Sequence, residues 1–118
     1  MRIDFASPVL AVSGFFTYNT PLLLQAFDPS SVLLDTLLSM FSANTALTGD
    51  VGSLPNELLS LDGGNIAYVT VLGNPLGGSF ALDDLSVISA VPEPATWALI
   101  VAVAAVVTLL APRRRARA

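Results

Sequence analysis

Residues 66–72 read Ile-Ala-Tyr-Val-Thr-Val-Leu, and this stretch decides the fold of the chain. Its β-branched and aromatic side chains favour an extended strand over a helix. Turn-forming residues flank it, with Asp62-Gly63-Gly64-Asn65 before it and residues 73–78 after it. The stretch therefore predicts a β-strand entered through a hairpin turn.

Short apolar runs separated by turn residues continue in both directions, across residues 3–90. This pattern is typical of strands rather than helices. It predicts seven strands, at residues 3–5, 9–18, 22–27, 32–41, 57–61, 66–72 and 79–88. The expected fold class is mainly β: an antiparallel, jelly-roll-like β-sandwich, complete or incomplete, or a partial barrel.

Three segments of this region carry further structural signals. Residues 30–41 also place leucines at a helical spacing, so a helix is an alternative there. Residues 42–56 are polar and are expected to form a long loop. In the last strand the apolar alternation shifts phase at Asp83-Asp84, which predicts a β-bulge.

Charge is divided unevenly along the chain. Residues 1–94 hold all nine acidic residues and one base, Arg2, for a net charge of −8, whereas residues 95–118 hold four arginines and no acid. An acidic body argues against a nucleic-acid partner, whose phosphates need a basic surface.

The chain has no cysteine, histidine or lysine. These absences exclude disulfides, thiolate or imidazole metal ligands, cysteine or histidine catalysis and Schiff-base chemistry. Near Met1 we expect no signal peptide, because a single base precedes Asp4 and residues 8–16 are interrupted by proline, serine and glycine.

The last 28 residues have three parts. Residues 91–94, Val-Pro-Glu-Pro, form a linker, and residues 95–111 are almost entirely apolar. As a helix, the apolar run would extend about 25 Å, near the lower limit for a bilayer span. Trp97 suits the membrane interface, and residues 112–118 form a basic cytoplasmic tail that stops transfer with Arg113, Arg114, Arg115 and Arg117.

This tail resembles the PEP-CTERM sorting signal of exopolysaccharide-producing Gram-negative bacteria. The resemblance rests on the order of its parts, which are Val91, Pro92, Glu93, Pro94 and Trp97, then the apolar run, then the arginines. The resemblance implies recognition by an exosortase, a membrane enzyme with a cysteine nucleophile that cuts near Pro-Glu-Pro. Two prolines keep the motif extended and outside any sheet, as a protease substrate requires. The alternative is a plain C-terminal membrane anchor with Pro-Glu-Pro as a linker.

The body is similar, more loosely, to carbohydrate-binding-module-like exported domains. The similarity rests on residues 77–87 (GGSFALDDLSV) and on the entry segments Ile3-Asp4-Phe5, Pro8-Val9 and Val12-Ser13-Gly14-Phe15. Such motifs mark strands, not a ligand.

Candidate ligand-binding residues in the body each have an ordinary structural alternative. Asp83 or Asp84 could bind Ca²⁺, although adjacent strand residues point to opposite faces and a solvated or turn-capping pair is favoured. Phe15, Phe16 and Tyr18 could stack on a sugar or lie in the core. We expect Asp28, Asp50 and Asp62 to cap turns, and Glu57 has no motif that would make it catalytic.

Together these features predict a non-enzymatic exported protein without a cofactor or metal. Its body would lie in the periplasm while the chain is anchored in the inner membrane, and would reach the cell surface or exopolysaccharide matrix of a biofilm after processing. The expected partners are an exosortase, membrane lipid and extracellular polysaccharide. The alternative is a carbohydrate-binding or adhesive module on a plain anchor.

Overall fold

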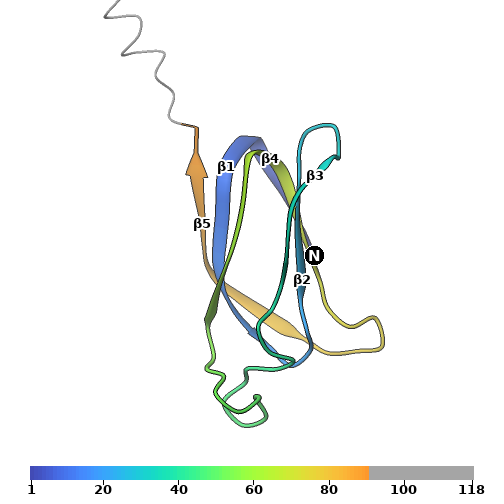
Figure 1. The fold of residues 1–118 in the computed structure, drawn as a ribbon, viewed down its shortest axis with the longest axis vertical. Coiled ribbons are helices and arrows are strands. Elements are labelled where there is room, and N and C mark those ends of the chain that lie inside the picture. The colour runs from blue at the N-terminus through green and yellow to red at the C-terminus, as the bar shows by residue number, and fades with distance from the viewer. Residues whose placement is uncertain (91–118) are drawn as a thin grey trace, which may run out of the picture.

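The computed structural model describes residues 1–90, which form five β-strands and no helix (Figure 1). The strands are β1 (Arg2–Tyr18), β2 (Leu23–Phe27), β3 (Leu33–Leu38), β4 (Glu57–Leu72) and β5 (Phe80–Ser89). They make one antiparallel sheet in the order β3-β2-β4-β1-β5. The predicted mainly β, antiparallel fold is therefore confirmed for this part of the chain.

The prediction of seven strands is wrong, because two pairs of predicted strands are each continuous. Residues 3–5 and 9–18 join in β1, and residues 57–61 and 66–72 join in β4. The expected hairpin turn at residues 62–65 is instead an irregular part of β4, in which Gly64 has a φ of 79°. A left-handed conformation of this kind is open to glycine at little cost.

The two long strands bend at the same place. Their pairing shifts register between Asp4 and Val9 of β1, where the partners on β4 are Tyr68 and Ile66, and again between Val9 and Ala11. Figure 1 shows β1 and β4 curving over together at one end of the sheet. As a result, β3 lies against the first half of β4 although the two strands are not paired, and the Asp62 N–H donates to Asp35 Oδ2 over 2.8 Å.

The core lies between the two halves of the bent sheet. Its buried apolar residues come from β1, β2 and β4 and from Leu22 just before β2, and they form one cluster: Val9, Val12, Phe16, Tyr18, Leu22, Leu24, Ala26, Leu59, Leu61, Ile66, Val69 and Val71. Leu34 and Leu37 of β3 and Phe80 and Leu82 of β5 pack at its margins. Burial of this apolar surface is the main force holding the bend closed.

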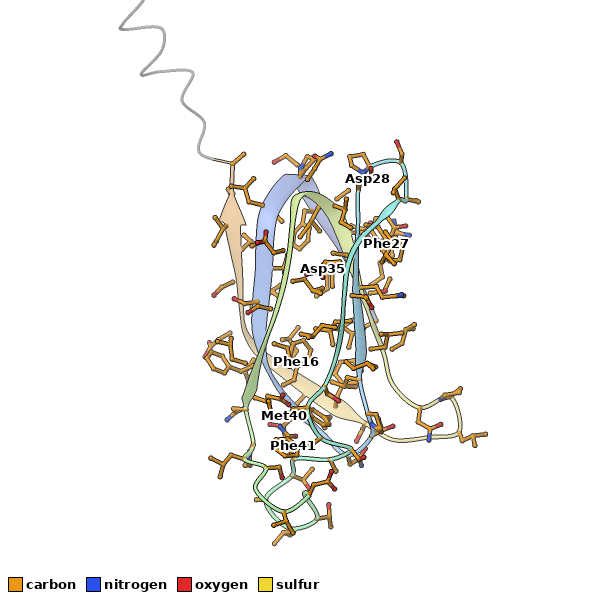
Figure 2. All side chains as sticks on the ribbon, viewed as in Figure 1. Phe16, Phe27, Asp28, Asp35, Met40 and Phe41 are labelled. Atoms are coloured by element: carbon orange, nitrogen blue, oxygen red, sulfur yellow. The ribbon has the colours of Figure 1, made fainter. Side chains whose placement is uncertain are left out.

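The helical alternative for residues 30–41 is wrong. Leu33–Leu38 forms β3, paired along its length with β2, because pairing satisfies the backbone of both strands while Leu34 and Leu37 reach the core. The long loop expected at residues 42–56 is confirmed and lies between β3 and β4. Met40 and Phe41 lie at the end of the molecule opposite Phe27 and Asp28 (Figure 2).

Candidate functional site

The residues predicted to carry sorting lie outside the described part of the chain. They are Val91, Pro92, Glu93, Pro94 and Trp97, together with the apolar segment 95–111 and Arg113, Arg114, Arg115 and Arg117. What the structure does describe is the strand that leads to them. β5 ends at Ser89, paired with Val9 of β1, two residues before Val91.

Within residues 1–90, no helix has the length and apolar character that crossing a membrane would require. The segment predicted to do so, residues 95–111, falls beyond this range. The membrane anchor therefore stays a prediction from the sequence.

Three neighbouring strands place a row of hydroxyl groups on the side of the sheet away from the core. Ser13 of β1 pairs with Ser60 of β4 and with Ser86 of β5. These serines alternate with the core residues Val12 and Leu61, so they point to the opposite face. We call this surface of β4, β1 and β5 the outer face.

Carboxylates and apolar side chains flank the hydroxyl row. On one side, Phe15 lies between Leu58 and Asp83; on the other, Ala11 lies between Asp62 and Ile88. A pocket of about 260 Å³ opens here, lined in part by all three serines, Asp35 and Asp62. The outer face thus combines hydrogen-bonding groups with exposed apolar surface.

The bulge predicted at Asp83-Asp84 is confirmed. Between Ser13 and Phe15 of β1, the partner strand advances from Ser86 to Asp83, one residue more than β1 does. Asp84 adopts a φ of 49°, which re-aims its side chain.

Adjacent residues of a regular strand point to opposite faces, and this bulge interrupts that alternation at Asp83 and Asp84. Asp83 and Asp84 line the same hollow of about 290 Å³, together with Phe15 and Asn56. Ca²⁺ takes six to eight oxygen ligands, more than these side chains supply. No group of three or more acidic, histidine or cysteine side chains suited to a metal occurs among residues 1–90.

The three aromatic residues proposed as a sugar platform are separated by the strand alternation. Phe16 and Tyr18 lie in the core, and Phe15 alone is on the outer face, where it is 36% exposed. Any stacking on a ligand at this surface would therefore fall to Phe15.

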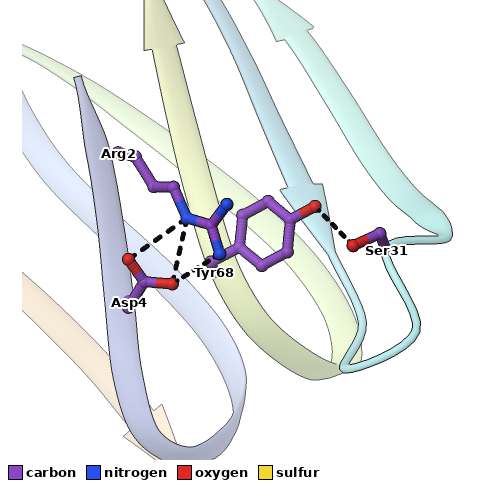
Figure 3. A network of polar contacts seen from close by, with 4 residues as sticks. All are labelled: Arg2, Asp4, Ser31 and Tyr68. Carbon is purple, nitrogen blue, oxygen red and sulfur yellow. Dashed lines mark hydrogen bonds and ion pairs between the residues drawn. The ribbon is translucent and has the colours of Figure 1, made fainter.

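A second aromatic group has no local signal in the sequence. Phe27 and Tyr68 are cross-strand partners whose rings stack with centroids 4.9 Å apart. The Arg2 guanidinium lies 3.8 Å from the centre of the Tyr68 ring and pairs with Asp4 at 2.8 Å, while the Tyr68 hydroxyl donates to Ser31 (Figure 3). Because Arg2 is engaged on both sides, this group ties β1, β4 and the turn after β2 together.

Glu57 has a structural role. The Tyr18 hydroxyl donates to Glu57 Oε2, and the Met40 N–H donates to Glu57 Oε1 over 3.2 Å. Burial raises the pKa of Tyr18, and its hydrogen bond to Glu57 raises it further. With both oxygens occupied in this way, Glu57 is held as part of the fold.

The turn-capping roles expected for aspartates are partly confirmed. Asp28 Oδ1 accepts hydrogen bonds from the N–H groups of Ser30 and Val32, and Asp50 Oδ2 accepts one from Ser42. Asp62 is the exception, because it lies in β4 rather than in a turn.

Comparison of the chain with protein-family models, curated proteins and solved structures finds no match.

Proposed function

We propose that this chain is a non-enzymatic exported protein that an exosortase releases from the inner membrane to the cell surface or exopolysaccharide matrix. One observation carries the proposal: the order of Val-Pro-Glu-Pro, an apolar segment and four arginines over residues 91–118. The basic end stops transfer, the apolar segment anchors the chain, and the proline-bounded motif offers an extended backbone to the enzyme.

The arrangement of the body supports cleavage at this point. The buried apolar residues of the described chain lie between Val9 and Val71, and the last side chains that pack against them are Phe80 and Leu82. A cut near Pro92 therefore removes none of these core residues. The released body would keep its fold, which we take to be a jelly-roll-like β-domain of the exported type.

Fractionation of the full chain, given an export signal and a tag, tests the proposal in hosts with and without an exosortase. We expect a shorter product outside the inner membrane only where the enzyme is present. Replacing both Pro92 and Pro94 by alanine should abolish this product. The Thr108→Ala variant is the matched control, because it leaves the motif and the apolar segment intact. The same size and location in both hosts would identify a plain anchor.

The outer face supports a second candidate function, the binding of extracellular polysaccharide. Sugars present hydroxyl groups that hydrogen-bond to serine and carboxylate oxygens, and apolar ring faces that pack on aromatic side chains. Ser13, Ser60 and Ser86 supply the first kind of group and Phe15 supplies the second.

Retention of the full chain on immobilised polysaccharide tests this second function. Phe15→Ala should weaken binding about tenfold, the effect of losing roughly 1.4 kcal/mol at an aromatic contact. Leu76→Ala removes an exposed apolar side chain from the turn between β4 and β5, outside the residues of this face, and should bind normally. Equal retention of both variants, or none of the parent chain, would remove the candidate.

A further inference from the structure

The last strand of the sheet is open along one side. β5 is an edge strand that contacts β1 and no other strand of the described chain. Val87 pairs with the core residue Val12 and points to the same side, yet Val87 is 43% exposed. On the opposite side of β5, Ile88 is 61% exposed. Apolar surface is therefore left uncovered on both faces of this strand.

Within residues 1–90, the open strand also lacks the usual protection against pairing. Proteins commonly block an edge with lysine, proline, inward-pointing charge or a covering segment. From Leu85 to Ser89 the sequence is Leu-Ser-Val-Ile-Ser, without a charge or a proline. The bulge at Asp83-Asp84 lies before this segment, and Pro92 follows it. The unpaired backbone groups of residues 85–89 can therefore accept another strand.

We propose that the occupant is β5 of a second copy of this chain, paired antiparallel about a two-fold axis at Val87. Val87 is the middle residue of the uncharged segment, so the axis places it opposite itself. Leu85 then faces Ser89 of the second copy, and Ser86 faces its Ile88. Each exposed apolar residue of the segment gains a neighbour, and two identical edges satisfy one another, as an isologous interface requires.

Charge favours this direction of pairing. In the antiparallel arrangement, Asp84 of one copy lies opposite residue 90 of the other. The two Asp84 residues are then six positions apart, about 20 Å at ~3.4 Å per residue. That exceeds the screening length of about 8 Å at physiological salt. Parallel pairing would set the acidic bulges of the two copies side by side, where they would repel.

Disulfide trapping tests the pairing, since the chain has no cysteine of its own. Full-length Val87→Cys chain, purified in detergent, should form a disulfide-linked dimer at least about tenfold faster than Leu38→Cys. Opposed residues of paired strands fall within the Cα separation that a disulfide needs. Leu38 is on the other edge strand and is 68% exposed, so it controls for accessibility and for association through the tail.

Two further variants fix the register. Leu85→Cys and Ser89→Cys should cross-link slowly alone and rapidly when mixed, because these positions face each other across the axis. Adding Ser86→Lys to Val87→Cys should slow the reaction several-fold, whereas Ser60→Lys on β4 should not. Equal rates at residues 85, 87 and 89, or a rate at residue 87 no faster than Leu38→Cys, would overturn the proposal. None of these readouts depends on export or sorting.

Discussion

The two edge strands of the sheet differ in how their free sides are covered. β3 contacts the first half of β4, where Asp35 accepts a hydrogen bond from the Asp62 N–H. The segment that follows β3 is held by a hydrogen bond from the Met40 N–H to Glu57. Within residues 1–90, β5 contacts no strand other than β1, and no side-chain hydrogen bond in this range involves any of its residues. The bend in β1 and β4 covers one edge and leaves the other open. The open edge is also the one that leads to the predicted sorting motif.

The largest expected difference between the β3 and β5 edges is the loss of unfolding free energy when a leucine near each edge is replaced by alanine. Leu61 lies in the half of β4 that contacts β3 and is fully buried, whereas Leu85 on β5 is 42% exposed. Leu61→Ala should lower the free energy of unfolding by about 2–5 kcal/mol through the cavity that it leaves. Leu85→Ala should lower it by less than about 1 kcal/mol, because little buried area is lost. Urea denaturation of both variants measures the difference, and similar losses would contradict the comparison.

Asn44 lies in the loop after β3 and joins this loop to β1 through hydrogen bonds. It is fully buried; its Oδ1 accepts the Tyr18 N–H over 2.7 Å, and its Nδ2 donates to the carbonyls of Phe16 and Leu54. Asn44→Ala leaves these buried groups without partners and should cost about 2–3 kcal/mol. Asn65→Ala, at an exposed position in β4, is the control and should stay within about 0.5 kcal/mol of the parent chain. A small effect at Asn44 would mean that the loop is not held by it.

Tyr18 makes the stability of the fold depend on pH. The pKa of Tyr18 is raised above its usual value, first by burial and then by Glu57, so folding opposes its ionisation. This contribution to stability is complete below about pH 10, the pKa in the unfolded chain, and is lost as pH rises through the higher folded pKa. Thermal unfolding between pH 8 and 12 should therefore show an alkaline fall in Tm.

The Tyr18→Phe variant should lose about 1 kcal/mol at neutral pH and show a shallower alkaline fall. Tyr68→Phe keeps Tyr18 and should fall as steeply as the parent chain. If all three curves had the same slope, the fold would not depend on a neutral Tyr18.

The smallest effect is expected at the contact between β3 and β4. Asp35→Ala removes the acceptor for the Asp62 N–H at the surface and should cost about 0.5–1 kcal/mol. Ser86→Ala on β5 has no side-chain partner to lose in the described chain and should be neutral within about 0.5 kcal/mol. Chemical denaturation of both variants measures the two losses of unfolding free energy. Equal losses would show that side-chain contacts do not distinguish the two edges.

Local sequence signals located the irregular points of the chain but did not predict whether each one is a turn or a bend within a strand. The breaks at Ser7-Pro8 and at Gly63-Gly64 are real, yet neither reverses the chain. They lie in the two register shifts on either side of the Val9–Ile66 pair and form one corner in two long strands. Whether a glycine pair makes a turn or a bend depends on the strand paired with it, and single-sequence patterns do not contain that information.

The same limit applied to the candidate sites. The phase shift at Asp83-Asp84 correctly predicted a bulge, since it is visible within one strand. The row of Ser13, Ser60 and Ser86 was not predictable, because it requires the register of three strands that are far apart in sequence. Likewise, Phe27 and Tyr68 became partners only when β2 paired with β4.

Hydrogen–deuterium exchange at two protein concentrations tests most directly whether one edge is covered and the other open. With the full chain in detergent at low concentration, amides of residues 85–89 should exchange faster than those in the middle of β4. Raising the concentration should slow exchange in residues 85–89 and leave residues 33–38 of β3 unchanged, since only the open edge gains a partner. Exchange in residues 85–89 that is independent of concentration, or slowing of both edges alike, would contradict this account.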